Sequence, residues 1–124
     1  MDRKICLDSD ILIDLSKGVN EIGERIDNLD AIFYITSINL FEIWFGRRNK
    51  ENLKQFIESF NILDFDLDSA LLAGDILRKL KDSGLTIDFR DLFIASICII
   101  NKIELMTNNL NHFERLKNFG LKLV

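Results

Sequence analysis

Two carboxylates interrupt an apolar stretch near the N-terminus, where the sequence reads "KICLDSDILIDL". Asp8 and Asp10 follow the apolar run Ile5-Cys6-Leu7 and are followed at once by further apolar residues. In an open parallel α/β sheet, ligands bind beyond the carboxyl ends of the strands, so Asp8 is a candidate site residue. An equally good interpretation is that Asp8 or Asp10 caps the helix that follows.

Two further acids stand in apolar surroundings far from the N-terminus. Glu42 lies within "INLFEIWFG", and a charge there must reach solvent or find a partner, because burying it alone is costly. An exposed strip on the helix is the alternative. Asp91 precedes "LFIASICII", three residues after Asp88. Asp88 as a helix N-cap and Asp91 as a first-turn acid favoured by the helix dipole are the structural alternative for this pair.

Three such acids, if they met at the strand ends, would suit a hard divalent cation. Mg²⁺ takes oxygen ligands, usually one or two carboxylates with several water molecules. A bound ion of this kind relieves the repulsion between the acids, can activate water and can hold a phosphodiester for in-line attack. Asp8, Glu42 and Asp91 are therefore the candidate metal ligands and catalytic residues.

The elements that must position these acids alternate along the chain between short apolar runs and longer helical patterns. This alternation predicts βα units and a parallel sheet that helices cover on both faces. Thr36 or Ser37 can cap the helix that carries Glu42, and Asp68 can cap the long helix after the third strand. The expected strands are 4–7, 31–35, 61–65, 103–107 and 121–124, and the expected helices are 10–18, 20–29, 38–46, 51–60, 69–84, 88–102 and 110–120.

The composition predicts one α/β domain over residues 1–124, with 48% apolar and 29% charged residues. Cys6 and Cys98 lie in apolar runs without CxxC spacing, which indicates reduced core thiols rather than a disulfide or a metal site. No membrane or secretion signal is visible, so we expect a cytoplasmic protein without membrane contact. The net charge of −4 excludes nucleic-acid binding through bulk electrostatics, and such a role would need a local site.

The sequence resembles the PIN-domain family, and within it the small VapC-like toxin ribonucleases of type II toxin–antitoxin systems. The matching pieces are "LDSDILIDL", "TSINLFEIWFG", "RDLFIASICI" and "MTNNLNHFERL", in an order and spacing that span nearly the whole chain. The resemblance implies a three-layer α/β/α fold with a parallel five-stranded sheet in the order 3-2-1-4-5. It also implies an endoribonuclease that depends on Mg²⁺ or Mn²⁺, with Asp8, Glu42 and Asp91 at its metal site.

The resemblance assigns further residues around that site. Asp10 falls where relatives often have a small polar residue, and Thr107 matches a polar residue that closes the pocket after the fourth strand. Asn109 stands where many relatives carry a fourth acid. An amide oxygen can bind a hard cation but adds no charge, so we expect weaker binding of a second ion. His112, the only histidine, is expected at the surface, with a general-base role as the alternative.

A basic group follows the Glu42 helix and could hold RNA phosphates beside the acidic pocket. It comprises Arg47, Arg48 and Lys50, with Lys54 close behind. The alternative is that these side chains only keep the helix surface hydrated.

Partner proteins are expected at the aromatic surface of the same helix. Phe41, Trp44 and Phe45 cannot all face one core from so short a helix, so part of this surface is an expected interface. By resemblance, it would receive an antitoxin segment or a second copy of the chain in a homodimer.

Two other functions compete with the nuclease. A PIN-like module that binds RNA or protein without cleavage would explain Asn109 in place of an acid. A phosphatase of the HAD type would explain "DSD" after the first strand, with Asp8 as nucleophile and Thr36 as a phosphate contact.

Overall fold

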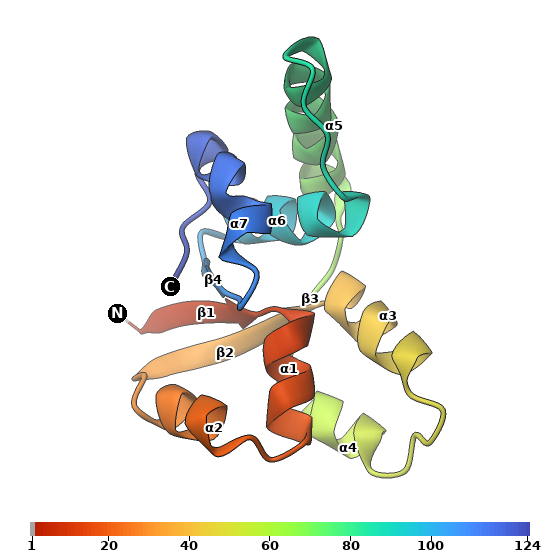
Figure 1. Ribbon diagram of the computed structural model, residues 1–124, viewed down its shortest axis with the longest axis vertical. Coiled ribbons are helices and arrows are strands. Elements are labelled where there is room, and N and C mark those ends of the chain that lie inside the picture. Colours follow the sequence, from red (N-terminus) through yellow and green to blue (C-terminus); the bar gives the residue numbers. More distant parts are fainter. Residues whose placement is uncertain (1) are drawn as a thin grey trace.

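A computed structural model describes residues 2–124 as a parallel sheet with helices on both faces (Figure 1). This confirms the predicted α/β architecture. The strands are β1 Arg3–Leu7, β2 Ala31–Thr36, β3 Asn61–Leu63 and β4 Glu104–Met106. The helices are α1 Ser9–Ser16, α2 Asn20–Asp27, α3 Ser37–Gly46, α4 Leu53–Glu58, α5 Leu67–Asp82, α6 Phe89–Asn101 and α7 Leu110–Phe113, followed by the 3₁₀ helix η1 Glu114–Phe119.

The sheet has the strand order β3-β2-β1-β4, and all its pairings are parallel. The prediction of five strands is wrong in number, because residues 121–124 form a single parallel bridge between Leu123 and Leu105. Two backbone hydrogen bonds join this segment to β4, from the Leu105 amide to the Lys122 carbonyl and from the Val124 amide to the Leu105 carbonyl. The segment nevertheless lies beside β4, which is where the order 3-2-1-4-5 expects the fifth strand.

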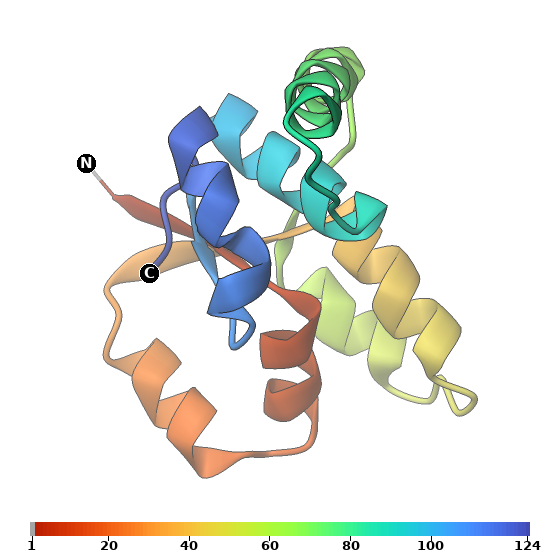
Figure 2. The same cartoon turned by 45° about the horizontal axis from the view of Figure 1, so that its top comes forward.

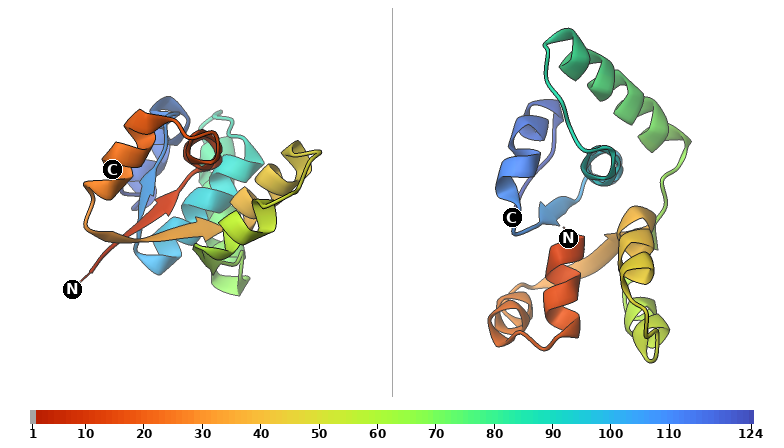
Figure 3. Two further views of the ribbon diagram at one scale, coloured as in Figure 1. Left: turned by 90° about the horizontal axis from the view of Figure 1, so that it is seen from below. Right: turned by 45° about the vertical axis from the view of Figure 1, so that its right-hand side comes forward.

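The core has two parts, one on each face of the sheet. Alternation along β1 sends Cys6 to one face and Ile5 and Leu7 to the other, and all three are fully buried. Cys6 packs with α5, α6 and the α7–η1 segment, whereas Ile5 and Leu7 pack with α1 to α4. Figure 3 shows α6 between the sheet and α5, which forms the outermost helix on its side.

The cysteines behave as the sequence predicts. Cys6 and Cys98 are free thiols, both buried in the same core cluster. The neighbouring Cys98 and the burial raise the pKa of the Cys6 thiol well above its ordinary value, so the thiol stays protonated. Over residues 2–124, none of the helices has the length and apolar character needed to cross a membrane.

Helix ends differ from the prediction at two places. Asp66, not Asp68, caps α5, because its side chain accepts a hydrogen bond from the Ser69 amide at 2.9 Å. Asp68 lies in the first turn, where the helix dipole favours an acid. The helix expected over 110–120 is divided into α7 and η1 and ends at Gly120, whose φ of 106° suits glycine.

Candidate active site

The site begins at the carboxyl end of β1, where the strand passes into α1. The Asp8 amide donates to the Met106 carbonyl at 2.9 Å, so the β1–β4 ladder continues to this residue. The Asp8 carboxylate accepts a hydrogen bond from the Ser9 amide at 2.8 Å and caps α1. Asp8 is only 6% exposed. The capping interpretation is therefore correct, and Asp8 also stands at the rim of the sheet, which is where a site residue was expected.

The loop after β4 closes one side of the site. Thr107, which is buried, donates from its hydroxyl to Asp8 Oδ2 at 2.8 Å. Asp10 Oδ2 accepts a hydrogen bond from the Asn108 amide at 3.0 Å. Asp8, Asp10 and Thr107 thus meet, although 97 residues separate Asp10 from Thr107. Asn109 reaches this group through its backbone amide, which donates to Thr107 Oγ1 at 3.0 Å, and the residue itself is exposed.

Glu42 reaches the site from the middle of α3. Its Oε1 accepts a hydrogen bond from the Ser9 hydroxyl at 2.9 Å, and its Oε2 lies 3.6 Å from Arg90 Nη1. The side chain is 23% exposed, so the carboxylate has partners and also reaches water. Its position combines both alternatives, because it lies at the edge of an apolar helix and faces the acid at the end of β1.

Asn39 connects these acids to the scaffold and is fully buried. Its side-chain oxygen accepts from the Thr36 amide at 3.0 Å and from the Thr36 hydroxyl at 2.6 Å, which forms a capping box at the start of α3. Its side-chain nitrogen lies 3.0 Å from Ser9 Oγ and 3.3 Å from Asp8 Oδ1. A single amide therefore fixes the start of α3 and orients the groups that hold Asp8 and Glu42.

We expect Asn39→Ala to lower the free energy of unfolding by about 2–4 kcal/mol, because it leaves the buried amide and hydroxyl donors of Thr36 without their partner. The matched control is Asn101→Ala, which removes a single bond of 2.8 Å to the Ile97 carbonyl and costs less than about 1.5 kcal/mol. Urea unfolding of both variants measures the difference. Equal losses in the two variants would show that Asn39 has no special role.

Asp91 enters from the first turn of α6. Asp88 caps this helix by accepting from the Arg90 amide at 2.8 Å, so the structural alternative for this pair is correct. The charges of Asp8 and Glu42 both raise the pKa of Asp91, so the three acids interact electrostatically. His112 is exposed at the surface, as predicted, and its Nδ1 lies 3.4 Å from Asp91 Oδ2.

The acids disfavour one another's charge. Burial, together with the charges of Asp88 and Asp8, raises the pKa of Asp91 to about 6. Burial is also the main reason that the pKa of Asp8 is raised, and Glu42 adds to the effect. Burial and the Asp8 charge raise the pKa of Asp10. Carboxylates whose pKa values are raised by their neighbours are typical of functional sites.

The stability of the protein without a divalent ion should therefore rise as the pH falls from 7.5 to 5. The folded state holds the Asp91 proton at a pH where the unfolded chain has released it, so the lower pH favours folding. After allowance for solvent screening of this half-exposed group, we expect about 1 kcal/mol. Urea unfolding in EDTA at several pH values measures this, and Asp91→Asn should flatten the slope. The same slope in both proteins would contradict the prediction.

A sequence model of the PIN domain matches residues 5–118. The chain belongs to the PIN-domain family. It is 37% identical to ribonuclease VapC1 of Methanocaldococcus jannaschii over 125 residues, which cover 98% of this chain and 88% of the relative. It is 31% identical to the tRNA(fMet)-specific endonuclease VapC of Salmonella typhimurium over 127 residues, which cover 96% of each chain.

Solved structures agree with this assignment. The PIN domain superposes on a chain of the VapBC2 complex from Rickettsia felis, bound to a promoter DNA fragment, with a TM-score of 0.85 and 28% identity. The match covers 98% of this chain and 97% of that one. A chain of the DNA-bound VapBC complex of Salmonella typhimurium gives a TM-score of 0.84 at 27% identity and covers 98% and 97% of the two chains. The predicted family is therefore confirmed.

The oxygen atoms at this site of the PIN domain are of the type that binds a hard divalent cation, but the acidic side chains that carry them are not close together. Carboxylate and hydroxyl oxygens are the groups that Mg²⁺ prefers. Over residues 2–124, no three acidic, histidine or cysteine side chains are close enough to form a ready-made cation site. Each acid is instead held by a local partner: Asp8 by Thr107, Glu42 by Ser9 and Asp91 by His112. Since Mg²⁺ keeps several water molecules, direct contact with all three acids is not required.

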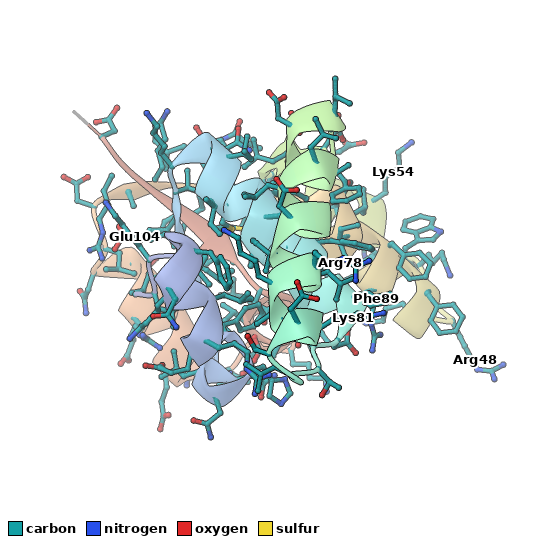
Figure 4. All side chains as sticks on the ribbon, turned by 90° about the horizontal axis from the view of Figure 1, so that it is seen from above. Arg48, Lys54, Arg78, Lys81, Phe89 and Glu104 are labelled. Atoms are coloured by element: carbon teal, nitrogen blue, oxygen red, sulfur yellow. The ribbon has the colours of Figure 1, made fainter. Side chains whose placement is uncertain are left out.

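The basic group that follows α3 in this PIN domain makes other contacts. Arg47 donates to the Ser16 hydroxyl at 2.6 Å, and Lys50 Nζ lies 5.2 Å from the centre of the Trp44 ring. Figure 4 shows Arg48 projecting from the edge of the molecule. These contacts do not include the acids, and RNA binding by Arg47, Arg48 and Lys50 stays a prediction.

Three residues with a direct place in the site were not predicted from the sequence. Asn39 stands three residues after Thr36, which is the spacing of a capping box and could have indicated its partner. Ser9 lies between two acids and carries no signal of its own. Arg90 lies between Asp88 and Asp91 in sequence, and only the fold brings it to Glu42.

Proposed function

We propose that this PIN domain is a metal-dependent endoribonuclease that hydrolyses RNA phosphodiester bonds and acts as the toxin of a toxin–antitoxin pair. The observation that supports the proposal is that Ser9 bridges the carboxylates of Asp8 and Glu42, while the charges of both acids, together with burial, raise the pKa of Asp91 to about 6. The ribonuclease and endonuclease names of the relatives support the same activity. The PIN-domain assignment replaces the phosphatase alternative.

In the proposed reaction, Asp8, Glu42 and Asp91 would hold Mg²⁺ or Mn²⁺. When bound, the ion would supply an activated water molecule and neutralise charge on the phosphate. Thr107 orients the Asp8 carboxylate, with its hydroxyl 2.8 Å from Oδ2. Ser9 orients Glu42 through the contact of 2.9 Å. Thr107 and Ser9 thus fix the directions of Asp8 and Glu42 before the substrate binds.

A single tightly bound ion is our proposal for this site. Asn109 is exposed, carries no charge and approaches the acids only through its backbone amide. Its amide oxygen would be at most a weak ligand of a second ion. Asp10 and Thr107 are accessory residues, because both belong to the hydrogen-bonded group around Asp8.

Arg90 competes with a metal ion for Glu42. Its guanidinium lies 3.6 Å from Glu42 Oε2 and 3.2 Å from Asp88 Oδ2. We expect Arg90→Ala to strengthen Mn²⁺ binding by about three- to tenfold, since the screened repulsion of one nearby cation is removed. Arg90→Lys keeps the charge and should bind Mn²⁺ like the wild type. Titration followed by electron paramagnetic resonance measures free Mn²⁺, and weaker binding by Arg90→Ala would contradict this role.

A protein partner is expected at α3. Phe41 and Phe45 are 59% and 81% exposed and stack on each other with ring centres 6.1 Å apart. Between α3, α4 and β3 lies a mostly apolar groove of about 630 Å³, lined by Leu40, Trp44 and Ile57 among others. Large exposed apolar surfaces mark interaction sites. We propose a cognate antitoxin and a second copy of the chain as the partners of this helix, in the cytoplasm.

Induced expression tests the proposed function. We expect wild type to arrest growth and to produce discrete RNA 5′ ends, which sequencing of RNA ends detects. Glu42→Gln should lose both effects, whereas the control Glu24→Gln, on the exposed face of α2, should keep them. Co-expression of the cognate antitoxin should relieve the arrest.

The outcome also separates the nuclease from a binding module. A protein that binds Mn²⁺ and RNA but yields the same RNA ends in wild type and in Glu42→Gln would be an RNA-binding PIN-like module. The absence of a ready-made cluster among the described acids, and Asn109 in place of an acid, are the observations in favour of that second candidate.

A further inference from the structure

A polar hollow of about 470 Å³ adjoins Asp91 on the side away from α3. It lies between the loop that precedes α6, the first turn of α6, and the α7–η1 segment. Figure 2 shows α7 and η1 lying beside α6. The volume is that of a pocket for a small organic ligand, which ordinarily measures about 300–1,000 Å³. The hollow is thus large enough for one nucleotide, and Asp91, a proposed metal ligand, forms part of its lining.

The groups that line the hollow are those that recognise single-stranded RNA. Arg115 donates from Nη1 to the Thr86 carbonyl at 2.6 Å, which holds the guanidinium in place and leaves further donors for a phosphate. Asn111 offers an amide with both a donor and an acceptor for the edge of a base. Ile87 and the His112 ring provide apolar and aromatic surface on which a base can stack.

The position of His112 connects the hollow to the acids. The ring is held by its contact of 3.4 Å with Asp91, yet 62% of the side chain stays exposed. A base stacked on the ring would place the adjoining phosphate toward Asp91, where the proposed reaction occurs. The acids Asp88 and Asp91 at the other end would repel a free anion, so the hollow favours a ligand that also binds through its base and sugar.

We propose that this hollow is the subsite for the nucleotide next to the scissile phosphate of the RNA, with Arg115 on a backbone phosphate and Asn111 and His112 on the base. The proposal rests on the nuclease function proposed above. It places RNA recognition on the α6–α7 side of the site, in contrast to the basic group after α3.

The only histidine of the chain gives a direct probe, because its Cε1 proton has a single resonance in the NMR spectrum. We expect the four nucleoside 5′-monophosphates, titrated at pH 7 with Mg²⁺ present, to shift this resonance with saturation. Arg115→Gln should weaken the apparent affinity by about five- to tenfold, the size expected for one hydrogen bond at an exposed position. The control Arg25→Gln, an exposed arginine on α2, should leave it unchanged.

Three results would overturn the proposal: no shift with any of the four nucleotides, equal affinity for inorganic phosphate, or equal weakening in Arg115→Gln and Arg25→Gln. A heteronuclear spectrum of Arg115→Gln with its dispersion retained shows that the variant is folded, and Asn111→Ala supplies a second test that does not disturb the Thr86 contact. Because the measurement needs no cleavage, nucleotide binding by a protein that cuts no RNA would refute the nuclease function alone.

Discussion

Asp8→Asn should lower RNA cleavage by at least about 100-fold while leaving the fold intact, because it removes the charge of the most buried proposed metal ligand. The replacement fits the site. The side-chain oxygen of asparagine can still accept from the Ser9 amide and from Asn39. Its side-chain amide NH2 group would face the Thr107 hydroxyl, which can accept a hydrogen bond as well as donate one.

Stability should respond in the opposite direction from activity. Burial raises the pKa of Asp8, so the carboxylate is disfavoured in the folded protein and a neutral residue removes that penalty. We expect the urea midpoint of Asp8→Asn to equal or exceed that of the wild type at pH 7. The control Asp27→Asn, at the exposed end of α2, should change neither quantity. Cleavage of RNA by Asp8→Asn at the wild-type rate would remove Asp8 from the mechanism.

Removal of divalent ions should have an effect of similar size. We expect EDTA to abolish cleavage by the purified protein, and either Mg²⁺ or Mn²⁺ to restore it, because uncompensated acids repel the phosphate. Mn²⁺ should also raise stability, by about 2.7 kcal/mol at a concentration 100 times its Kd, since the ion binds the folded state. Gel analysis of a labelled RNA and thermal unfolding with increasing Mn²⁺ measure the two effects.

Asp91→Asn provides the control for ion binding, because it should lose most of the stabilisation by Mn²⁺ while remaining folded. The ion should also reverse the pH dependence described above: a bound cation favours the charged acids, so the loaded protein gains stability as the pH rises. Full cleavage in EDTA would show that the reaction does not depend on a divalent ion.

The acids could be found from the sequence because their local surroundings are unusual. A carboxylate at the end of an apolar strand and a glutamate within an apolar helix both conflict with the local pattern, and such conflicts are common at functional sites. Asp8 and Glu42 became candidates in this way, with a helix cap and an exposed strip as the alternatives, and in the structure both carboxylates accept hydrogen bonds from Ser9. The alternation of short apolar runs with helical patterns predicted the parallel sheet that carries them.

The connections between these residues could not be predicted, because they depend on side-chain directions after folding. Thr107 and Asp8 are 99 residues apart, and the bond between them depends on the register of β1 and β4. Arg90 was not predicted, because nothing near it in the sequence indicates that the fold brings it within 3.6 Å of Glu42. Residues 121–124 were predicted to form a strand but form only one bridge, because an apolar pattern in a short terminal segment does not determine how many hydrogen bonds form between strands.

The helix cap before α5 shows the same limit at short range. Asp66 and Asp68 are two residues apart, and both are suitable capping residues. The choice depends on backbone conformation, and Asp66 has the extended conformation that places its oxygen 2.9 Å from the Ser69 amide. The sequence thus predicted the helix but placed its start two residues too late.

The backbone bond from Asp8 to Met106 ties one side of the site directly to the sheet. Asp8 cannot be displaced without sliding β1 against β4, whereas Glu42 and Asp91 are carried by helices whose side chains contact only a few neighbours at this edge. Substitutions on the exposed sides of α3 and α6 therefore leave the backbone bond of Asp8 untouched, so the rim of the site can change in shape around one anchored carboxylate.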